Sequence, residues 1–391
     1  MEKKMEVYLD NAATTKPNKE IKDIVNNSFD ELYANPSSLH TLGVRVEREI
    51  KEVKKIILKD LSSSDGKMIF TSGGTESNNL AIKGAVNAYK RLGKHIITTE
   101  FEHKSILNTV GSLEDEGFKV TYIKPNSNGL IELNDIISAI QKDTILVSIM
   151  FVNNEIGTLQ PIKEIGKYLS TLKNKPIFHV DGVQAFMKMK INVEELNIDL
   201  FSFSAHKIHA LKGLGGLYVK KGIRIKPLMF GGQQENSLRP GTENTIGIFA
   251  LKNAVLDFIK NRENYYNNVK ELKRAFVNSI TSELSDVYIN GDFSKASPYI
   301  VNIAFVGVKG EVLLHYLEMK KIYVSTGSAC NSKTKSFSYV LHAINVPDKL
   351  KEGSIRFSFS KFTTKNEIKY ALDEIIFRVN EYRSMMKNGK K

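Results

Sequence analysis

The chain is predicted to fold as an α/β protein, with a large domain built on a mostly parallel sheet flanked by helices and a smaller α+β domain. Strand-like and helical segments alternate between about residues 67 and 220, as in parallel sheets whose crossovers are helices. After about residue 245 a long helical pattern is followed by short strands and helices. The length of 391 residues also exceeds what one hydrophobic core usually supports.

Short apolar runs bounded by turn residues define the strands of the predicted sheet. They cover residues 68–70, 95–99, 119–123, 144–150, 176–180, 199–203 and 216–219. Helical patterns lie between most of these runs. One covers residues 75–90 and ends before Gly93, and another covers residues 161–172 and begins with a proline.

The smaller domain is predicted from the change of pattern after the sheet. A helix is expected over residues 245–282, and the last helix is expected to start at Thr364, where Thr364 and Glu367 have the spacing of a capping box. We therefore assign residues 15–257 to the large domain. Residues 1–14 and 258–391 are assigned to the small domain, with the N-terminal segment packed on it.

Composition indicates a globular protein and a reducing compartment. Hydrophobic residues make up 41% of the chain and charged residues 25%, and no apolar run reaches the ~18 residues of a membrane span. The N-terminus lacks the apolar core of a signal peptide. Cys330 is the only cysteine, which excludes internal disulfides and zinc sites built on several cysteines. We expect a cytoplasmic protein with no membrane contact and no metal site.

The net charge of +13 raises the question of nucleic-acid binding. The basic residues are mostly lysines spread along the chain, and no interleaved arginine and aromatic pattern is present. A solvated, lysine-rich surface is therefore favoured over direct nucleic-acid binding, although a basic RNA-binding protein stays open as an alternative.

Lys207 is the most informative residue for function. It follows the strand-like run 199–203 in the segment Ser204-Ala-His206-Lys207, and a glycine-rich turn comes next. A lysine at a strand end can be desolvated and become a nucleophile toward a carbonyl. Ser204 and His206 can donate hydrogen bonds to an anion beside it. These are the requirements of pyridoxal phosphate (PLP), and a surface lysine at a strand end is the competing interpretation.

Polar residues also follow the other strands of the predicted sheet. The turn Ser72-Gly-Gly74-Thr75 leads into a helix, and backbone N–H groups at such a helix start can bind phosphate. Asp181 follows the run 176–180, where a carboxylate can pair with a protonated pyridine nitrogen or cap a helix. His103 follows the run 95–99 and can stack on a cofactor ring and shuttle protons. Asn154 follows the run 144–150 at the same edge.

Two residues of the smaller domain carry possible chemistry. Arg356 lies in an alternating, strand-like segment, and its planar guanidinium suits a substrate carboxylate or a structural salt bridge. Cys330 lies in a segment rich in serine, glycine and lysine, unlike a buried structural cysteine. Lys333 and Lys335 nearby would favour its thiolate. A nucleophile on a mobile loop is the functional interpretation.

Together these residues resemble the NifS/IscS-type cysteine desulfurases, a branch of the class V aminotransferase group of fold-type I PLP enzymes. The resemblance extends from residue 8 to residue 364. It rests on the segments Thr71-Ser-Gly-Gly74-Thr75-Glu-Ser-Asn-Asn79, Val152-Asn-Asn154-Glu-Ile-Gly157, His179-Val-Asp181-Gly-Val-Gln184, Ser204-Ala-His206-Lys207, Arg239-Pro-Gly-Thr242 and Thr326-Gly-Ser-Ala-Cys330. One departure is Ala210-Leu211, where the family usually has Gly-Pro.

The resemblance implies a role for each matching residue. Lys207 would hold PLP through its amine and later abstract the substrate's Cα proton, Asp181 would pair with the pyridine nitrogen, and Gln184 would contact the ring hydroxyl. The other implied roles are His103 stacking on the ring, Gly74, Thr75, Ser204 and His206 at the phosphate, Thr242 reaching the phosphate from the second subunit of a homodimer, Asn154 and Arg356 at the substrate carboxylate, and Cys330 attacking the substrate sulfur to become a persulfide.

The implied reaction converts L-cysteine to L-alanine and passes the sulfur from Cys330 to an acceptor protein. An IscU-type iron–sulfur scaffold and a ThiI- or MnmA-type tRNA-thiolating enzyme are both open as acceptors. A selenocysteine lyase or a transaminase on the same fold is the alternative enzyme, and a transaminase needs no thiol at Cys330.

Overall fold

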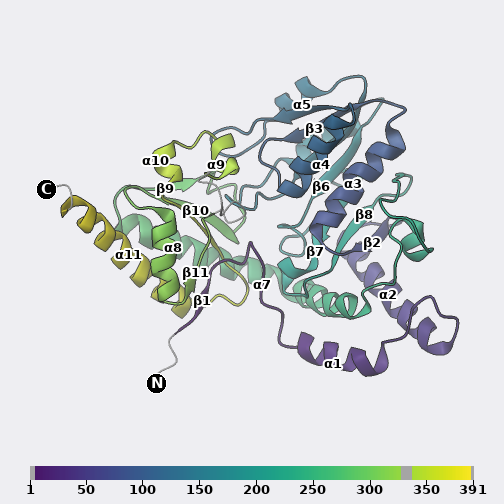
Figure 1. The fold of residues 1–391 in the computed structure, drawn as a ribbon, viewed down its shortest axis with the longest axis horizontal. Coiled ribbons are helices and arrows are strands. Elements are labelled where there is room, and N and C mark those ends of the chain that lie inside the picture. The colour runs from purple at the N-terminus through teal and green to yellow at the C-terminus, as the bar shows by residue number, and fades with distance from the viewer. Residues whose placement is uncertain (1–4, 327–336, 389–391) are drawn as a thin grey trace.

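A seven-stranded sheet is the centre of the larger part of the molecule, in the strand order β2-β8-β7-β6-β5-β3-β4 (Figure 1). The computed structural model describes residues 5–326 and 337–388. The neighbouring strands from β7 to β4 are parallel, whereas β8 runs antiparallel to both β2 and β7. The strands are β2 (Lys67–Thr71), β3 (His95–Thr99), β4 (Lys119–Ile123), β5 (Thr144–Met150), β6 (Ile177–Asp181), β7 (Leu200–Ser204) and β8 (Gly215–Val219).

Helices cover both faces of this sheet, so alternate side chains of one strand enter different cores. Ile96 packs in the core that contains residues of α3 and α4, whereas its neighbour Ile97 packs in the core with α2, α6 and the first half of α7. The helices of this part are α1 (Ile21–Glu31), α2 (Thr41–Asp60), α3 (Gly74–Tyr89), α4 (Lys104–Asp115), α5 (Leu133–Ala139) and α6 (Ile162–Ser170). Burial on both faces explains why the inner strands of this sheet bury every side chain and carry few charged residues.

The long helix α7 (Thr245–Glu283) joins the two parts of the molecule (Figure 1). Phe258 in its first half belongs to the core beneath the large sheet, whereas Phe276 belongs to a separate core in the smaller part. That smaller core packs against a three-stranded antiparallel sheet, in which β10 lies between β12 and β9. Its elements are β9 (Val287–Asn290), β10 (Ile300–Phe305), β12 (Ser354–Ser358), α8 (Gly310–Met319) and α11 (Lys365–Asn388).

The N-terminal segment packs on the smaller part. Strand β1 (Val7–Tyr8) pairs in parallel with β11 (Ile322–Tyr323), and Val7 and Leu9 are fully buried in the smaller core. Two short helices, α9 (Tyr339–Ala343) and α10 (Asp348–Lys351), lie between β11 and β12. Leu341 of α9 is buried in the larger core, so the chain returns there after residue 336.

The predicted elements agree with the structure along most of the sheet. The expected strands 95–99, 119–123 and 144–150 have the observed bounds, and the expected helix 245–282 differs from α7 by one residue. The capping box is present, because the Thr364 backbone N–H and side-chain hydroxyl donate to Glu367, and the Glu367 N–H donates to Thr364 Oγ1. In the part of the chain that the structure describes, no helix is long and apolar enough to cross a membrane.

Candidate active site

A cavity of about 900 Å³ lies where the carboxyl ends of the parallel strands meet the smaller part. Strand register brings its residues together: Met150 pairs with Asp181, and Asp181 pairs with Ser202. Of the residues predicted to act in one site, the cavity is lined by Gly74, Thr75, His103, Asn154, Asp181, Gln184, Ser204, His206, Lys207 and Arg356. The structure therefore places most of the predicted set around a single cavity at the edge where open α/β sheets bind ligands.

Lys207 enters this cavity from a single 3₁₀ turn, Ala205–Ile208, directly after β7. Its ammonium nitrogen donates hydrogen bonds to the backbone carbonyls of Ala12 and Ala13, each at 2.6 Å. The side chain is half-buried. The turn ends at His209, which has a left-handed φ of 67° and packs its ring against Phe362. A short strand end and a tight turn thus hold the amine against the N-terminal segment rather than in solvent.

Asp181 is a buried carboxylate at the end of β6. Its Oδ2 accepts a hydrogen bond from Asn78 Nδ2 at 2.9 Å, and its Oδ1 accepts one from the Val183 backbone N–H at 2.9 Å. The Val183 bond is the cap that the competing interpretation predicted, but no α-helix follows it. Asn78 lies on α3 and also donates to Ser105 Oγ, so Asp181 is fixed from two elements.

His103 caps the N-terminus of α4 through its ring. Its Nδ1 accepts a hydrogen bond from the Ser105 backbone N–H at 3.1 Å and lies 2.8 Å from Ser105 Oγ. The cavity walls lower the pKa of His103 by desolvation, and the carboxylate of Asp181 partly opposes this shift. An acceptor role at Nδ1 leaves the proton of the neutral ring on Nε2. The cap fixes the ring plane at the cavity.

Neutral and positive donors gather near the start of α3. Gly74 and Thr75 are the first residues of this helix, where backbone N–H groups lack helical partners. Ser204 is buried, and His206 Nδ1 lies 3.0 Å from Thr14 Oγ1. Burial and the positive charge of Lys207 lower the pKa of His206 to about 4, so its ring is neutral at pH 7. This group of donors suits a phosphate.

Arg356 of β12 reaches the cavity from the smaller part. Its Nη2 forms an ion pair with Asp10 at 2.8 Å, and its Nη1 donates to the backbone carbonyl of Asn154 at 3.0 Å. Arg356 therefore forms a structural salt bridge and also lines the cavity, so both interpretations of this residue have support in the structure. The buried Nε of Arg356 and Oδ1 of Asn154 have no hydrogen-bond partner among the described residues. Of these two atoms only the Nε donor could serve a carboxylate, because the Asn154 oxygen is an acceptor; Asn154 would bind a carboxylate through its amide nitrogen.

Two buried carboxyl groups near the cavity were not among the predicted site residues. Glu102 accepts hydrogen bonds from Thr99 Oγ1 and the Met150 N–H, and burial raises its pKa to about 8. Glu155 accepts a hydrogen bond from Ser338 Oγ, and burial raises its pKa to about 7. Their positions beside His103 and Asn154, in segments already identified, are the signal that could have found them.

Gln184 and a second lysine complete the wall behind Asp181. Gln184 Nε2 donates to the Ala12 carbonyl at 3.0 Å, and Gln184 Oε1 accepts from Lys188 Nζ at 3.1 Å. Lys188 is buried and was not predicted to take part. Its position four residues after Gln184 is the only sequence signal for it.

Cys330 lies outside the described residues, and so does the segment that was expected to carry it as a mobile loop. The described residues on either side of that segment border the cavity: Ser325 before it, and Phe337, Ser338 and Tyr339 after it. The Tyr339 hydroxyl donates to the Glu102 carbonyl at 2.8 Å.

Thr242 is exposed in the turn that follows Arg239, and it is not among the residues that line the cavity of its own chain. Arg239 forms an ion pair with Glu76 at 2.9 Å, which holds this turn beside the start of α3. Thr242 therefore differs from the other predicted residues in its placement.

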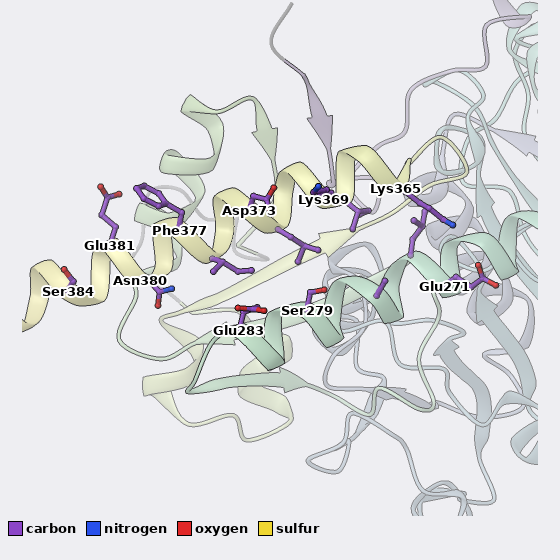
Figure 2. Close-up of a pocket in the computed structure, with 15 residues that line it drawn as sticks. Glu271, Ser279, Glu283, Lys365, Lys369, Asp373, Phe377, Asn380, Glu381 and Ser384 are labelled. Carbon is purple, nitrogen blue, oxygen red and sulfur yellow. The ribbon is translucent and has the colours of Figure 1, made fainter.

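A second cavity, of about 1350 Å³, is a groove between α7 and α11 in the smaller part (Figure 2). Figure 2 shows polar side chains of both helices along it, including Glu283, Lys369 and Asp373. Apolar residues such as Leu272 and Leu372 form the rest of its lining. The mixed charges give it no clear chemistry, so the first cavity is the candidate active site.

The donor set of the first cavity fits a phosphorylated pyridine aldehyde. The Lys207 amine can react with an aldehyde, the buried Asp181 carboxylate can pair with a ring nitrogen, and the start of α3 with Ser204 can hold a phosphate. The His103 ring stands at the same cavity. These residues come from the ends of four strands, β2, β3, β6 and β7.

Comparisons with known proteins agree with this geometry. Residues 7–371 match the family model for aminotransferase class-V. The chain is 42% identical to the cysteine desulfurase IscS of Dictyoglomus turgidum, over 99% of this chain and all of that protein. A solved NifS-like protein superposes with a TM-score of 0.90 at 32% identity, covering 96% of this chain and all of that one. A structure of SspA in complex with cysteine gives 0.81 at 34% identity, covering 92% of this chain and all of the other.

Proposed function

Because the chain belongs to the class-V aminotransferase family, we propose that it is a PLP-dependent cysteine desulfurase. The observation that carries the proposal is the convergence of the Lys207 amine and the Asp181 carboxylate on one cavity that also holds phosphate donors. Relatives named as cysteine desulfurases support it, because the similarity to them covers nearly the whole length of both chains. L-cysteine would be the substrate and L-alanine the product.

The residues around the cavity would hold the cofactor at both ends. Lys207 would hold it through its amine, Asp181 would pair with the ring nitrogen, and the His103 ring would lie against the cofactor ring. Bound PLP supplies an electron sink for the carbon atoms of an amino acid. The phosphate would be held by Gly74, Thr75, Ser204 and His206 of one chain and Thr242 of the partner.

Substrate binding would depend on the Arg356 guanidinium and on the amide nitrogen of Asn154. A carboxylate can accept hydrogen bonds from the guanidinium, whose position is set by Asp10 and the Asn154 carbonyl. The Asn154 side chain, at the same wall, would hold the other carboxylate oxygen. Lys207 would then move the substrate's Cα proton, because its amine lies in the same cavity.

Cys330 would take the sulfur. Its thiolate attacks the substrate Sγ, a new S–S bond forms, and the Cβ–Sγ bond breaks with its electron pair going to the carbon skeleton. The skeleton takes up a proton at Cβ and leaves as alanine, so L-cysteine and the Cys330 thiol become alanine and a Cys330 persulfide. Cys330 is five residues after Ser325, a wall residue, and an extended chain of that length spans at most ~18 Å.

A homodimer would complete the site. Large apolar side chains are exposed on α1, in the connection to α2, at the start of α2 and in the segment before Thr242, namely Phe29, Tyr33, Leu39, Leu42, Val44, Met229 and Phe230. Glu235 of that segment pairs with Lys54, which ties the segment to α2. Burial of such a patch against a second copy would bring Thr242 toward the partner's phosphate donors.

The sulfur acceptor would be a separate protein in the cytoplasm, either an IscU-type scaffold for iron–sulfur clusters or a ThiI- or MnmA-type tRNA-thiolating enzyme. A lone cysteine suits a reducing compartment.

The test is the fate of the substrate sulfur. Purified protein should show a visible absorption band that borohydride removes. After incubation with L-cysteine, mass spectrometry should find one extra sulfur on the Cys330 peptide and one alanine released per sulfur. Cys330→Ser should keep the band and transfer no sulfur. Alanine formation from L-selenocysteine but not from L-cysteine would favour a selenocysteine lyase, keto-acid production a transaminase, and absence of the band a non-enzymatic protein.

A further inference from the structure

Lys188 is a buried lysine at the back of the candidate active site. Only 5% of its surface is exposed, and its Nζ donates to Gln184 Oε1 at 3.1 Å. The amine also lies 5.4 Å from the centre of the Tyr299 ring, in the smaller part of the molecule. Lys188 therefore lies at the junction of the two parts, behind the wall that faces the cavity.

Burial of an amine is costly unless it is neutral or well bonded. Desolvation, followed by the positive charge of Lys207, lowers the pKa of Lys188 to about 7. A leucine or methionine at this position would avoid that cost. The lysine is therefore expected to provide an interaction that an apolar side chain cannot make, and the observed one is its hydrogen bond to Gln184.

The amine fixes which way the Gln184 amide faces. A lysine amine that donates needs an oxygen opposite it, so the Gln184 carbonyl oxygen must lie on the Lys188 side. The amide nitrogen then lies on the other side, where it donates to the Ala12 carbonyl at 3.0 Å. Lys207 Nζ donates to the same Ala12 carbonyl at 2.6 Å. Gln184 and Lys207 thus share one acceptor, and a flipped amide would break both contacts of Gln184.

We propose that Lys188 is a positioning residue that holds the Gln184 amide with its N–H groups toward the cavity, so that the second N–H can donate to the ring hydroxyl of the cofactor. The inference rests on the proposed function, since it takes PLP as the ligand. Lys188 acts through Gln184 and need not touch the cofactor. Without it, the amide can rotate and present its oxygen to the hydroxyl, which favours the protonated form of that hydroxyl.

A matched control exists in the same chain. Lys273 on α7 is equally buried, with 3% exposed, and burial also lowers its pKa to about 7. Its Nζ donates to the Ser297 carbonyl at 2.8 Å and lies over the Phe293 ring. Lys273→Met therefore removes a buried amine without touching Gln184.

The experiment compares the wild type with Lys188→Met, Gln184→Ala, the double variant and Lys273→Met. Each is stripped of cofactor and titrated with PLP, and the dissociation constant, the ratio of the visible to the near-ultraviolet absorption band and the melting temperature are measured. Lys188→Met should weaken PLP binding roughly three- to tenfold, the effect of one lost hydrogen bond. It should also move absorption from the visible to the near-ultraviolet band. Lys188→Leu replaces it if Lys188→Met does not fold.

The double variant decides whether Lys188 acts through Gln184. In the Gln184→Ala background, loss of Lys188 should change neither the dissociation constant nor the band ratio further. Lys273→Met should lower the melting temperature and leave both readouts unchanged. Additive effects in the double variant, or a Lys188→Met variant that only loses thermal stability, would overturn the inference. A wild type that binds no PLP would instead overturn the proposed function.

Discussion

At the scale of single residues, Lys207 is the group on which the proposed chemistry depends. Its amine is held by two backbone carbonyls of the N-terminal segment, so its position does not depend on a ligand. Lys207→Ala should still bind PLP, but more weakly, through the phosphate donors and Asp181. Turnover of L-cysteine should fall by at least ~10²-fold, since the proton-transfer group is lost.

The measurement for Lys207 is alanine formation together with borohydride fixation of the cofactor. In the variant, borohydride should no longer attach the cofactor to the protein. Lys212→Ala, which changes an exposed lysine of the following loop, is the control and should behave as the wild type. Full turnover by Lys207→Ala would rule out this role.

Asp181 tests whether a buried carboxylate serves the cofactor or only the local turn. Asp181→Asn keeps the volume of the side chain and an oxygen that can accept the Val183 N–H, but its amide nitrogen replaces the oxygen that accepts from Asn78, so the melting temperature should fall only modestly. Loss of the negative charge should lower turnover by about tenfold or more, because the ring nitrogen loses its counter-charge. Thermal denaturation and steady-state kinetics of the same samples make the comparison. A large drop in melting temperature with normal turnover would support the turn-cap interpretation.

At the scale of elements, apolar runs predicted the strands well, whereas long-range pairings could not be predicted. Strands β3 and β5 are buried on both faces, so their bounds coincide with segments of buried residues between polar turns. The edge strand β4 is only partly buried, and its bounds follow from Val120, Tyr122 and Ile123. Nothing local indicates that β8 runs antiparallel between β2 and β7. Contacts such as Arg356 with Asp10, 346 residues apart, arise only when the smaller part folds back on the N-terminal segment.

The same contrast between local pattern and long-range packing applies to the candidate site residues. The shared placement of Lys207, Asp181 and His103 could be predicted because each lies at the end of a strand or a few residues after it, and the ends of parallel strands share one edge. The buried groups Glu102 and Lys188 could not, because burial of a charged side chain depends on the packing of other elements around it. Thr242 was assigned by resemblance alone, and its role remains a prediction.

The turn between β3 and α4 leads to a prediction about pH and stability. Burial raises the pKa of Glu102 from 4.5 to about 8, so the folded protein keeps this proton where the unfolded chain has lost it. This contribution to stability is fully present below about pH 4.5 and is lost as the pH rises to about 8. Glu155, with its pKa raised to about 7, contributes in the same direction.

As the pH rises from about 5 to about 9, the melting temperature of Glu102→Gln should therefore fall less than that of the wild type. The amide has the shape of the protonated acid and cannot ionise. Glu263→Gln, on an exposed position of α7, is the control and should follow the wild-type curve. Parallel curves for Glu102→Gln and wild type would mean that Glu102 is ionised in the folded protein, contrary to the shift argued from its burial.

At the scale of the whole molecule, the resemblance predicts that active sites are shared between two chains, with Thr242 of one chain at the phosphate of the other. Thr242 is exposed and outside the cavity of its own chain, so Thr242→Glu should not disturb the fold. In a homodimer it would bring a negative charge against the phosphate of the partner's cofactor and lower PLP affinity and turnover. Light scattering should give the mass of two chains for both the wild type and the variant.

Mixed dimers turn this prediction into a decisive measurement. Lys207→Ala and Thr242→Glu chains are each inactive or weak alone. When they are co-expressed with different tags and purified through both, each mixed dimer carries one site with both changes and one site with neither, because Lys207 and Thr242 of one site come from different chains. Turnover should recover to about half of the wild-type value per dimer. If each site used its own Thr242, both sites of a mixed dimer would carry one change, and turnover would stay at the level of the parent variants.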